Sequence, residues 1–202
     1  MALPRQSGSG YYDRFRDRAT FSIANLSNRV IAFGARALQA EQEPKYLNSP
    51  ETAIYHKGNV LYGLAHTRDA IRRSDSAIVV EGYMDLLSLV QAGIENVVAT
   101  SGTALTEDHC RALARYAHRI VLLFDGDAAG SNAAMRGLEI VLGSGADARV
   151  VSLPSEHDPD TFVQAEGPDA LLSMAEKGQS ALDFYLYQMG KQHDLEIGRA
   201  HV

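Results

Sequence analysis

The pattern of apolar and polar positions changes at Ala77. Beyond it, four short runs rich in β-branched and aliphatic residues alternate with segments that have the apolar period of a helix. The runs are AIVVE (77–81), NVVAT (96–100), RIVLLF (119–124) and ARVVSL (148–153). Helices are expected between them at 83–93, 106–118 and 128–145, and after them at 168–178 and 180–190. Near-continuous apolar strands separated by helices are typical of a parallel sheet covered on both faces, so the pattern predicts an α/β fold with right-handed crossovers.

Before Ala77 the alternation is shorter and more often broken. Residues 19–23 and 28–38 flank Asn25 and Ser27, which predicts a hairpin. Residues 41–50 contain two prolines and are expected to form an extended loop, and residues 65–74 a short helix. We therefore expect a mixed α+β subdomain at 1–74, an α/β domain at 75–157 and the start of a helical subdomain at 158–196.

The last six residues, IGRAHV, need a separate interpretation. They equal an in-frame translation of a common sequencing-library adapter, so we expect residues 197–202 to be a non-native tail. The alternative is a genuine frayed terminus. A non-native tail would make the chain a piece of a longer protein.

Composition limits the classes of protein that the chain can represent. Its 202 residues are 46% hydrophobic, enough for one core or one core with a satellite layer. No apolar run reaches the roughly 18 residues of a membrane span, and the first ten residues lack the apolar segment of a secretory signal. The single cysteine, Cys110, excludes an intrachain disulfide and a multi-cysteine zinc site, so no zinc is expected and the cytoplasm is the simplest location.

Charge is distributed unevenly along the chain. The formal net charge is −6, but residues 1–73 hold 11 Lys and Arg against 6 Asp and Glu, and residues 74–202 hold 8 against 19. This asymmetry suits a protein that holds a polyanion with its first part and metal cations with its second. The alternative is a chance excess on a solvated surface.

Carboxylates follow three of the four predicted strands. Glu81 ends the first strand, Asp125 and Asp127 follow the third, and Asp158 and Asp160 follow the fourth. Ligands of open parallel sheets lie outside the carboxyl ends of the strands, so we expect these acids at one edge. Packed carboxylates repel one another, and a divalent cation relieves the repulsion. The pattern predicts an oxygen-rich site for Mg²⁺ or Mn²⁺.

The Asp125-Gly126-Asp127 turn is the most informative of these sites. Two acids separated by one residue at a strand end can point into the same cavity, and the glycine leaves room for phosphate and metal. The small residues 128–130 then begin a helix whose first amides are accessible to an anion. The alternative is a solvated turn with helix-capping aspartates.

These strand ends resemble a known family. A strand that ends in Glu-Gly, followed by a later strand that ends in Asp-Gly-Asp, resembles the Toprim fold of primases and topoisomerases. Over roughly residues 11–165 the resemblance narrows to bacterial DnaG-type primases, whose topoisomerase relatives have other sequences around the glutamate and lack PKYLNSPET. The motifs that carry it, in family order, are RFRDR, VIAFGAR, PKYLNSPET, HKGNVLYGL, VVEGYMD, SGTALT, LLFDGDAAG and DPDTF.

The resemblance implies a role for each matching position. Glu81 is similar to the family's metal ligand or general acid/base near the primer 3′-hydroxyl, and Asp125 and Asp127 to its paired metal ligands. Asp85 resembles an auxiliary acid, and Asp158 and Asp160 an outer acidic pair. The positions that resemble contacts to nucleotide phosphates and template are Arg16, Arg36, Lys45, Tyr46, Asn48 and Lys57. Two departures, Gly34-Ala35-Arg36 for Gly-Gly-Arg and TFSIANLSN for a proline-containing run, do not touch the acids.

The resemblance also implies substrates and partners. We expect a Toprim domain preceded by part of a basic subdomain, Mg²⁺ or Mn²⁺ as cofactor, and single-stranded DNA, NTPs and an RNA primer as substrates. The replicative helicase is expected to bind the full-length protein through a domain that this chain lacks, and no membrane is involved. The alternatives are another Toprim enzyme, either a topoisomerase or a nuclease, and a non-catalytic DNA-binding module. His109, Cys110 and His118, on a predicted helix, are expected to be packing or surface residues rather than ligands.

Overall fold

The computed structural model describes residues 2–4, 9–126 and 132–192. Its contacts divide the chain into two compact units, residues 1–56 and residues 57–202, which we describe one at a time. Residues 57–74, grouped above with the upstream subdomain, pack within the second unit. The expected tail at 197–202 and Asp127 lie outside the described residues.

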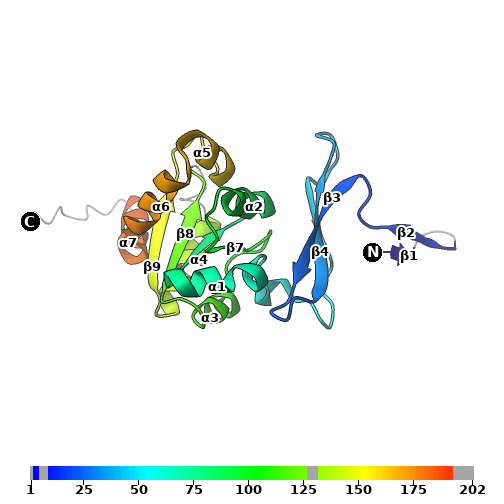
Figure 1. Cartoon of the computed structure of the whole chain (residues 1–202), viewed down its shortest axis with the longest axis horizontal. Helices are drawn as coiled ribbons and strands as arrows, with labels where there is room; N and C mark the ends of the chain where they lie inside the picture. The colour runs from blue at the N-terminus through cyan, green and yellow to red at the C-terminus, as the bar shows by residue number, and fades with distance from the viewer. Residues whose placement is uncertain (1, 5–8, 127–131, 193–202) are drawn as a thin grey trace, which may run out of the picture. The chain divides into compact units, whose positions relative to one another are not determined.

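The first unit is built from β-strands (Figure 1). β1 (Ala2–Pro4) pairs with β2 (Tyr11–Asp13), and a three-stranded antiparallel sheet has the order β3 (Arg18–Ala24), β4 (Val30–Ala37) and β5 (Tyr46–Asn48). The predicted hairpin is confirmed as β3–β4. Its turn is fixed by Asn25, whose side-chain oxygen accepts from the backbone N–H groups of Ser27 and Arg29 at 3.0 and 3.1 Å. β5 lies inside the segment predicted to be a loop.

The second unit contains a five-stranded sheet in the order β10-β9-β8-β6-β7. β6 (Ser76–Val80), β7 (Val97–Ala99), β8 (Arg119–Phe124) and β9 (Asp147–Ser152) are parallel and confirm all four predicted strands. The short β10 (Gln179–Ser180) is antiparallel to β9. Because β6, β8 and β9 are neighbours, their carboxyl ends lie side by side.

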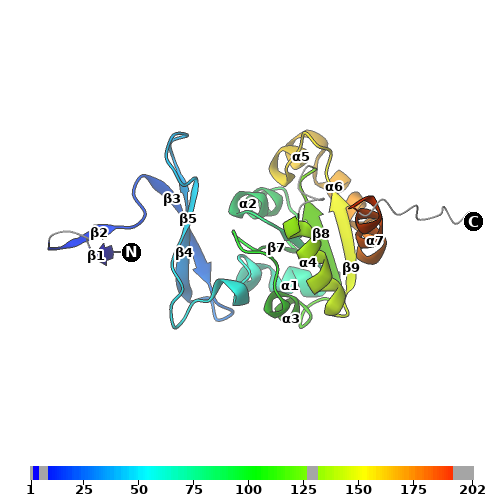
Figure 2. The ribbon, with the colours of Figure 1, turned by 180° about the vertical axis from the view of Figure 1, so that it is seen from behind.

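Helices cover both faces of this sheet (Figures 1 and 2). One apolar layer holds side chains of α1 (Leu64–Ser74), α3 (Glu107–Leu113), α4 (Asn132–Gly143) and α7 (Ala181–Gln192). The other layer holds side chains of α2 (Tyr83–Gln91), α5 (Pro159–Glu166) and α6 (Pro168–Glu176). Successive residues of β8 alternate between the layers, which explains why the strand is apolar throughout.

Two short elements complete the second unit. A 3₁₀ turn, η1 (Lys57–Asn59), precedes α1. The helix α5 begins the segment 158–196 that was expected to be helical, although the apolar pattern predicted no helix before residue 168, and this segment packs within the second unit. In the structure Asp158 is the N-cap and Pro159 occupies the first turn, where its missing N–H costs nothing. Among the described residues no helix is long and apolar enough to cross a membrane.

Candidate active site

The carboxyl ends of β6, β8 and β9 bring most of the predicted acids to one edge of the second unit. Glu81, directly after β6, is exposed, and Asp125, directly after β8, is half-buried. Asp158 and Asp160 begin α5, which follows β9. Asp127 lies outside the described residues, so its placement stays a prediction.

Asp85 reports that four of these acids share one electrostatic environment. Burial raises the pKa of Asp85, and the negative charges of Asp158, Glu81 and Asp160 raise it further. The packing of α2 against α5 brings these carboxylates together. Asp85 also holds the turn that carries Glu81, since its Oδ2 accepts a 2.9 Å hydrogen bond from the Gly82 backbone N–H.

Both members of the outer pair, Asp158 and Asp160, already accept hydrogen bonds within α5, and Asp158 caps this helix. Asp158 accepts from the backbone N–H of Thr161 at 2.8 Å and from its hydroxyl at 2.7 Å. The backbone bond is the main cause that lowers the pKa of Asp158, so this carboxylate ionises more readily than an aspartate without such partners. Asp160 accepts from Gln164 Nε2 at 2.6 Å.

Gly126 has a different function from the one expected. A Cβ at this position would lie 2.5 Å from Ser155 Cα and 2.6 Å from both Leu153 O and Pro154 C. The backbone of the β9–α5 connection therefore fills the space that the sequence had suggested for phosphate and metal. Glycine is required here because this connection packs against the turn after β8, which holds the segments of Asp125 and Asp158 together.

Residues 100–103, directly after β7, border the Glu81 turn. The backbone N–H of Thr100 donates to Val80 O at 3.1 Å, and that of Ser101 donates to Glu81 O at 2.9 Å. Ser101 is buried and has a left-handed φ of 57°. The SGTALT motif thus begins at the candidate site, although its residue types gave no sign of a contact to Glu81.

The donor set fits a hard divalent cation. Each candidate ligand is a carboxylate, the group that Mg²⁺ and Mn²⁺ prefer, and a bound cation would relieve the repulsion that, after burial, helps to raise the pKa of Asp85. Among the described residues, no three His, Cys, Asp or Glu side chains are close enough to form a ready-made metal site. The acids are gathered at one edge without forming a closed cage.

Most of the predicted phosphate-binding residues lie in the first unit. The register of β4 and β5 pairs Arg36 with Tyr46 and Gly34 with Asn48, so Arg36, Tyr46 and Asn48 occupy one face of the sheet. Lys45 Nζ lies 5.9 Å from the centre of the Tyr46 ring, and the Arg16 guanidinium lies 5.6 Å from that of Tyr12. Lys57 is half-buried in η1 of the second unit.

Arg14 is a structural residue that the sequence analysis did not single out. Its Nε and Nη2 both donate to the backbone carbonyl of Asn48, at 3.1 and 2.9 Å. This pair of bonds fastens β5 and therefore the face that carries Arg36 and Tyr46. Arg14 is the first residue of the RFRDR motif, but no sequence pattern indicated that it would bind the Asn48 carbonyl.

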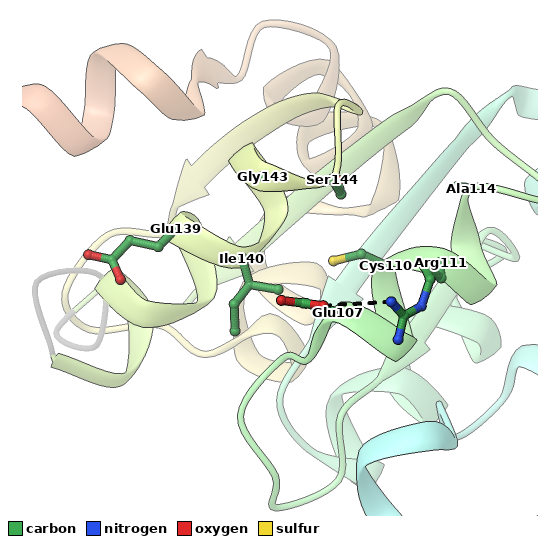
Figure 3. A pocket seen from close by; sticks show the side chains of 8 residues that line it. All are labelled: Glu107, Cys110, Arg111, Ala114, Glu139, Ile140, Gly143 and Ser144. Carbon is green, nitrogen blue, oxygen red and sulfur yellow. Dashed lines mark ion pairs between the residues drawn. The ribbon is translucent and has the colours of Figure 1, made fainter.

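A cavity of about 420 Å³ lies elsewhere, between α3 and α4 (Figure 3). It is lined by Cys110, Ile140 and small residues, with the Glu107–Arg111 ion pair at 3.6 Å on one side. None of the predicted site residues lines it. The cavity therefore does not compete with the acidic edge as the candidate active site.

Comparisons with known proteins agree with this arrangement. Residues 1–68 match the family model "DNA primase catalytic core, N-terminal domain", and residues 78–163 match "Toprim-like". The chain is 47% identical to the DNA primase of Pseudomonas putida over 198 residues, 95% of this chain and 30% of the relative. It is 44% identical to the DNA primase of Clostridium acetobutylicum over 181 residues, 89% of this chain and 30% of the relative. The chain thus spans about 30% of the length of these curated relatives.

Solved structures extend the likeness to the fold. A crystal structure of a DNA primase domain from Pseudomonas aeruginosa superposes with a TM-score of 0.87 at 44% identity, over 95% of this chain and 60% of that one. The DnaG primase catalytic domain bound to ssDNA superposes with a TM-score of 0.86 at 40% identity, over 95% and 62%. These likenesses confirm the expected Toprim architecture.

Proposed function

The chain belongs to the family of bacterial DnaG-type DNA primases, and we propose that it synthesises short RNA primers on single-stranded DNA by metal-dependent nucleotidyl transfer. The observation that carries this proposal is the convergence of Glu81, Asp85, Asp158 and Asp160, which the packing of α2 against α5 brings close enough for their charges to interact. The contact between Gly126 and the backbone of residues 153–155 ties Asp125 to the same edge.

The acids at the sheet edge are assigned to metal binding in the nucleotidyl-transfer reaction. Glu81 and Asp125 would hold Mg²⁺ or Mn²⁺ together with Asp127, and Asp85, Asp158 and Asp160 would complete the negative field. When bound, the metal lowers the pKa of the attacking hydroxyl and neutralises the pyrophosphate that leaves. Asp85 keeps the Glu81–Gly82 turn in place through the Gly82 N–H.

We propose single-stranded DNA, NTPs and an RNA primer as the substrates. DNA is supported by the relative whose catalytic domain is bound to ssDNA. Phosphate contacts are assigned to one set of residues: Arg16, Arg36, Lys45, Tyr46, Asn48 and Lys57. For the whole protein we propose the replicative helicase as a partner and the cytoplasm, where the chromosome is replicated, as the location.

One reaction separates this proposal from its alternatives. The chain is incubated with a single-stranded template, an annealed RNA primer, labelled NTPs and Mn²⁺, with the Asp125→Asn variant as control. Ribonucleotide extension that the variant loses supports a primase. Shortened DNA would indicate a nuclease, and DNA binding with neither product would indicate a non-catalytic module.

A further inference from the structure

The connection between β7 and α3 contains none of the residues assigned to metal or phosphate binding. The connection is residues 100–106, which contain the SGTALT motif, and with the flanking residues Ala99 of β7 and His109 of α3 it forms one continuous segment. At its start, Ala99 exchanges two backbone hydrogen bonds with Tyr62, at 2.9 and 3.0 Å, and Ser101 N–H donates to Glu81 O at 2.9 Å. This end of the connection is therefore attached directly to the turn that carries Glu81.

The other end of the connection holds η1. The Thr106 hydroxyl donates to Gly58 O at 2.6 Å, and it also caps α3 by accepting from the His109 backbone N–H at 3.1 Å. His109 is fully buried, and its Nε2 lies 3.0 Å from Lys57 O. Because a carbonyl only accepts, Nε2 carries the proton. Burial lowers the pKa of His109, which keeps the ring neutral.

One continuous segment therefore contacts both Glu81 and Lys57. The two residues lie 24 positions apart in the sequence, and α1 and β6 separate them. Lys57 is the only predicted phosphate-binding residue placed in the described part of the second unit, which also carries the acids. A segment that fixes both backbones also fixes the separation between a phosphate contact and the candidate catalytic glutamate.

We propose that residues 99–109 form a brace that sets the position of Lys57 relative to Glu81, with Thr106 and His109 as positioning residues for nucleotidyl transfer. The proposal rests on the proposed function, because Lys57 needs a triphosphate to contact. His109 takes no part in the chemistry itself. It acts through the carbonyl of Lys57, and Thr106 acts through that of Gly58.

The test compares His109→Leu, which fills the space but donates nothing, with His109→Gln, whose amide can donate to Lys57 O. We expect His109→Leu to raise the KM for ATP in primer extension by about tenfold with little change in kcat, as expected when a binding contact is displaced. His109→Gln should restore most of the loss. Thr106→Val should act like His109→Leu, and Thr106→Ser should stay near wild type.

Two controls separate positioning from general damage. His66→Leu removes an exposed imidazole from α1 and should leave KM unchanged. Lys57→Met should raise KM by itself, and adding His109→Leu to it should raise KM no further, because both changes remove the same contact. Additive effects of the two changes, or failure of His109→Gln to restore KM, would overturn the proposal.

Hydrogen exchange gives a readout that does not depend on activity. In His109→Leu, the amides of residues 57–63 should exchange faster, while those of β8 keep the wild-type rate. Unchanged exchange at 57–63 would refute the brace even if KM changed. If the wild type extends no primer but the exchange result holds, the proposed function fails and the brace stands as a structural feature without the assigned role in catalysis.

Discussion

The two units of this primase-family chain bury very different amounts of apolar surface. In the described part of the first unit the buried apolar side chains are Ile23, Ala32, Ala35 and Tyr55, whereas Val30 and Phe33 of β4 are exposed. The second unit has two apolar layers, one on each face of its sheet. The candidate catalytic acids lie on the thickly packed unit, and most of the phosphate contacts on the thin one.

This difference fits the demands of the two tasks. Holding a cation and a reacting phosphate requires carboxylates fixed within a fraction of an ångström, and a close-packed core provides that rigidity. Contacts to a DNA backbone are electrostatic and tolerate small shifts, so a thin sheet with exposed cations suffices. Variants of the second unit should therefore lose nucleotide incorporation, whereas variants of the first unit should lose DNA affinity.

Removing a catalytic acid should have the largest effect. We expect Glu81→Gln and Asp125→Asn each to reduce nucleotide incorporation by at least about 100-fold, because a metal-centred electrostatic interaction is lost. Folding should survive, since both side chains are at least partly exposed and repulsion is relieved. The matched control is Asp183→Asn, which removes the charge of an exposed aspartate of α7. Circular dichroism of each variant checks the fold. Near-normal synthesis by either acid variant would contradict the assignment.

Gly126→Ala should destabilise the closely packed second unit through a steric clash. The added methyl would meet backbone atoms of residues 153–155, so we expect the free energy of unfolding to fall by about 1–3 kcal/mol. Primer extension should fall with it. Gly143→Ala is the control, because a Cβ there meets no described atom within 4 Å. Urea unfolding of both variants decides; equal stabilities would mean that the tight contact at Gly126 is unimportant.

Arg36→Met and Lys45→Met should weaken DNA binding without damaging the acids. Each phosphate contact that is lost should lower the slope of log K against log salt by about 1, and metal binding should be unchanged. Fluorescence anisotropy of a labelled single strand at several salt concentrations measures the slope. Arg29→Met, in the hairpin turn, removes a cation at a position not predicted to contact DNA. A slope that stays constant in both test variants would show that these are only surface charges.

The smallest expected effect is a slow reaction of the Cys110 thiol, which tests how tightly the second unit is packed. Cys110 lies on the buried face of α3, and burial raises the pKa of its thiol to about 11. We expect alkylation of the native chain to be slow at neutral pH and to keep increasing with pH beyond about 8.5, where a free thiol would level off. Iodoacetamide labelling followed by mass spectrometry gives the rate, with the urea-unfolded chain as control. Rapid native labelling would mean that this layer opens easily.

The sequence predicted the parts of the fold that depend on local pattern. All four parallel strands and the β3–β4 hairpin followed from apolar periodicity and turn residues. β5 has three residues and exists because β4 pairs with it, so nothing local indicated it. The start of α5 does have a local sequence signal, since Asp158-Pro159 with Thr161 is a helix-capping sequence, but the same two acids, Asp158 and Asp160, also fit a metal site.

The candidate site was predictable in its residue types and only partly in its geometry. The acids at the strand ends followed from the rule for parallel sheets, and Glu81, Asp85, Asp158 and Asp160 do share one environment. The reason for Gly126 was wrong, because its constraint comes from a segment about thirty residues away. The contacts of Arg14 and His109 depend on carbonyl groups, which no side-chain pattern reveals.

The turns that lead into the parallel strands lie at the edge of the sheet opposite the acids. The turn between α4 and β9 is open, since a Cβ at Gly145, or at Gly143 at the end of α4, would meet no described atom within 4 Å. A flexible tether inserted at Ser144–Gly145 would be attached at the edge of the sheet opposite the one that carries the acids. This turn is therefore the natural place to attach a fluorophore or a surface anchor for watching single molecules extend a primer.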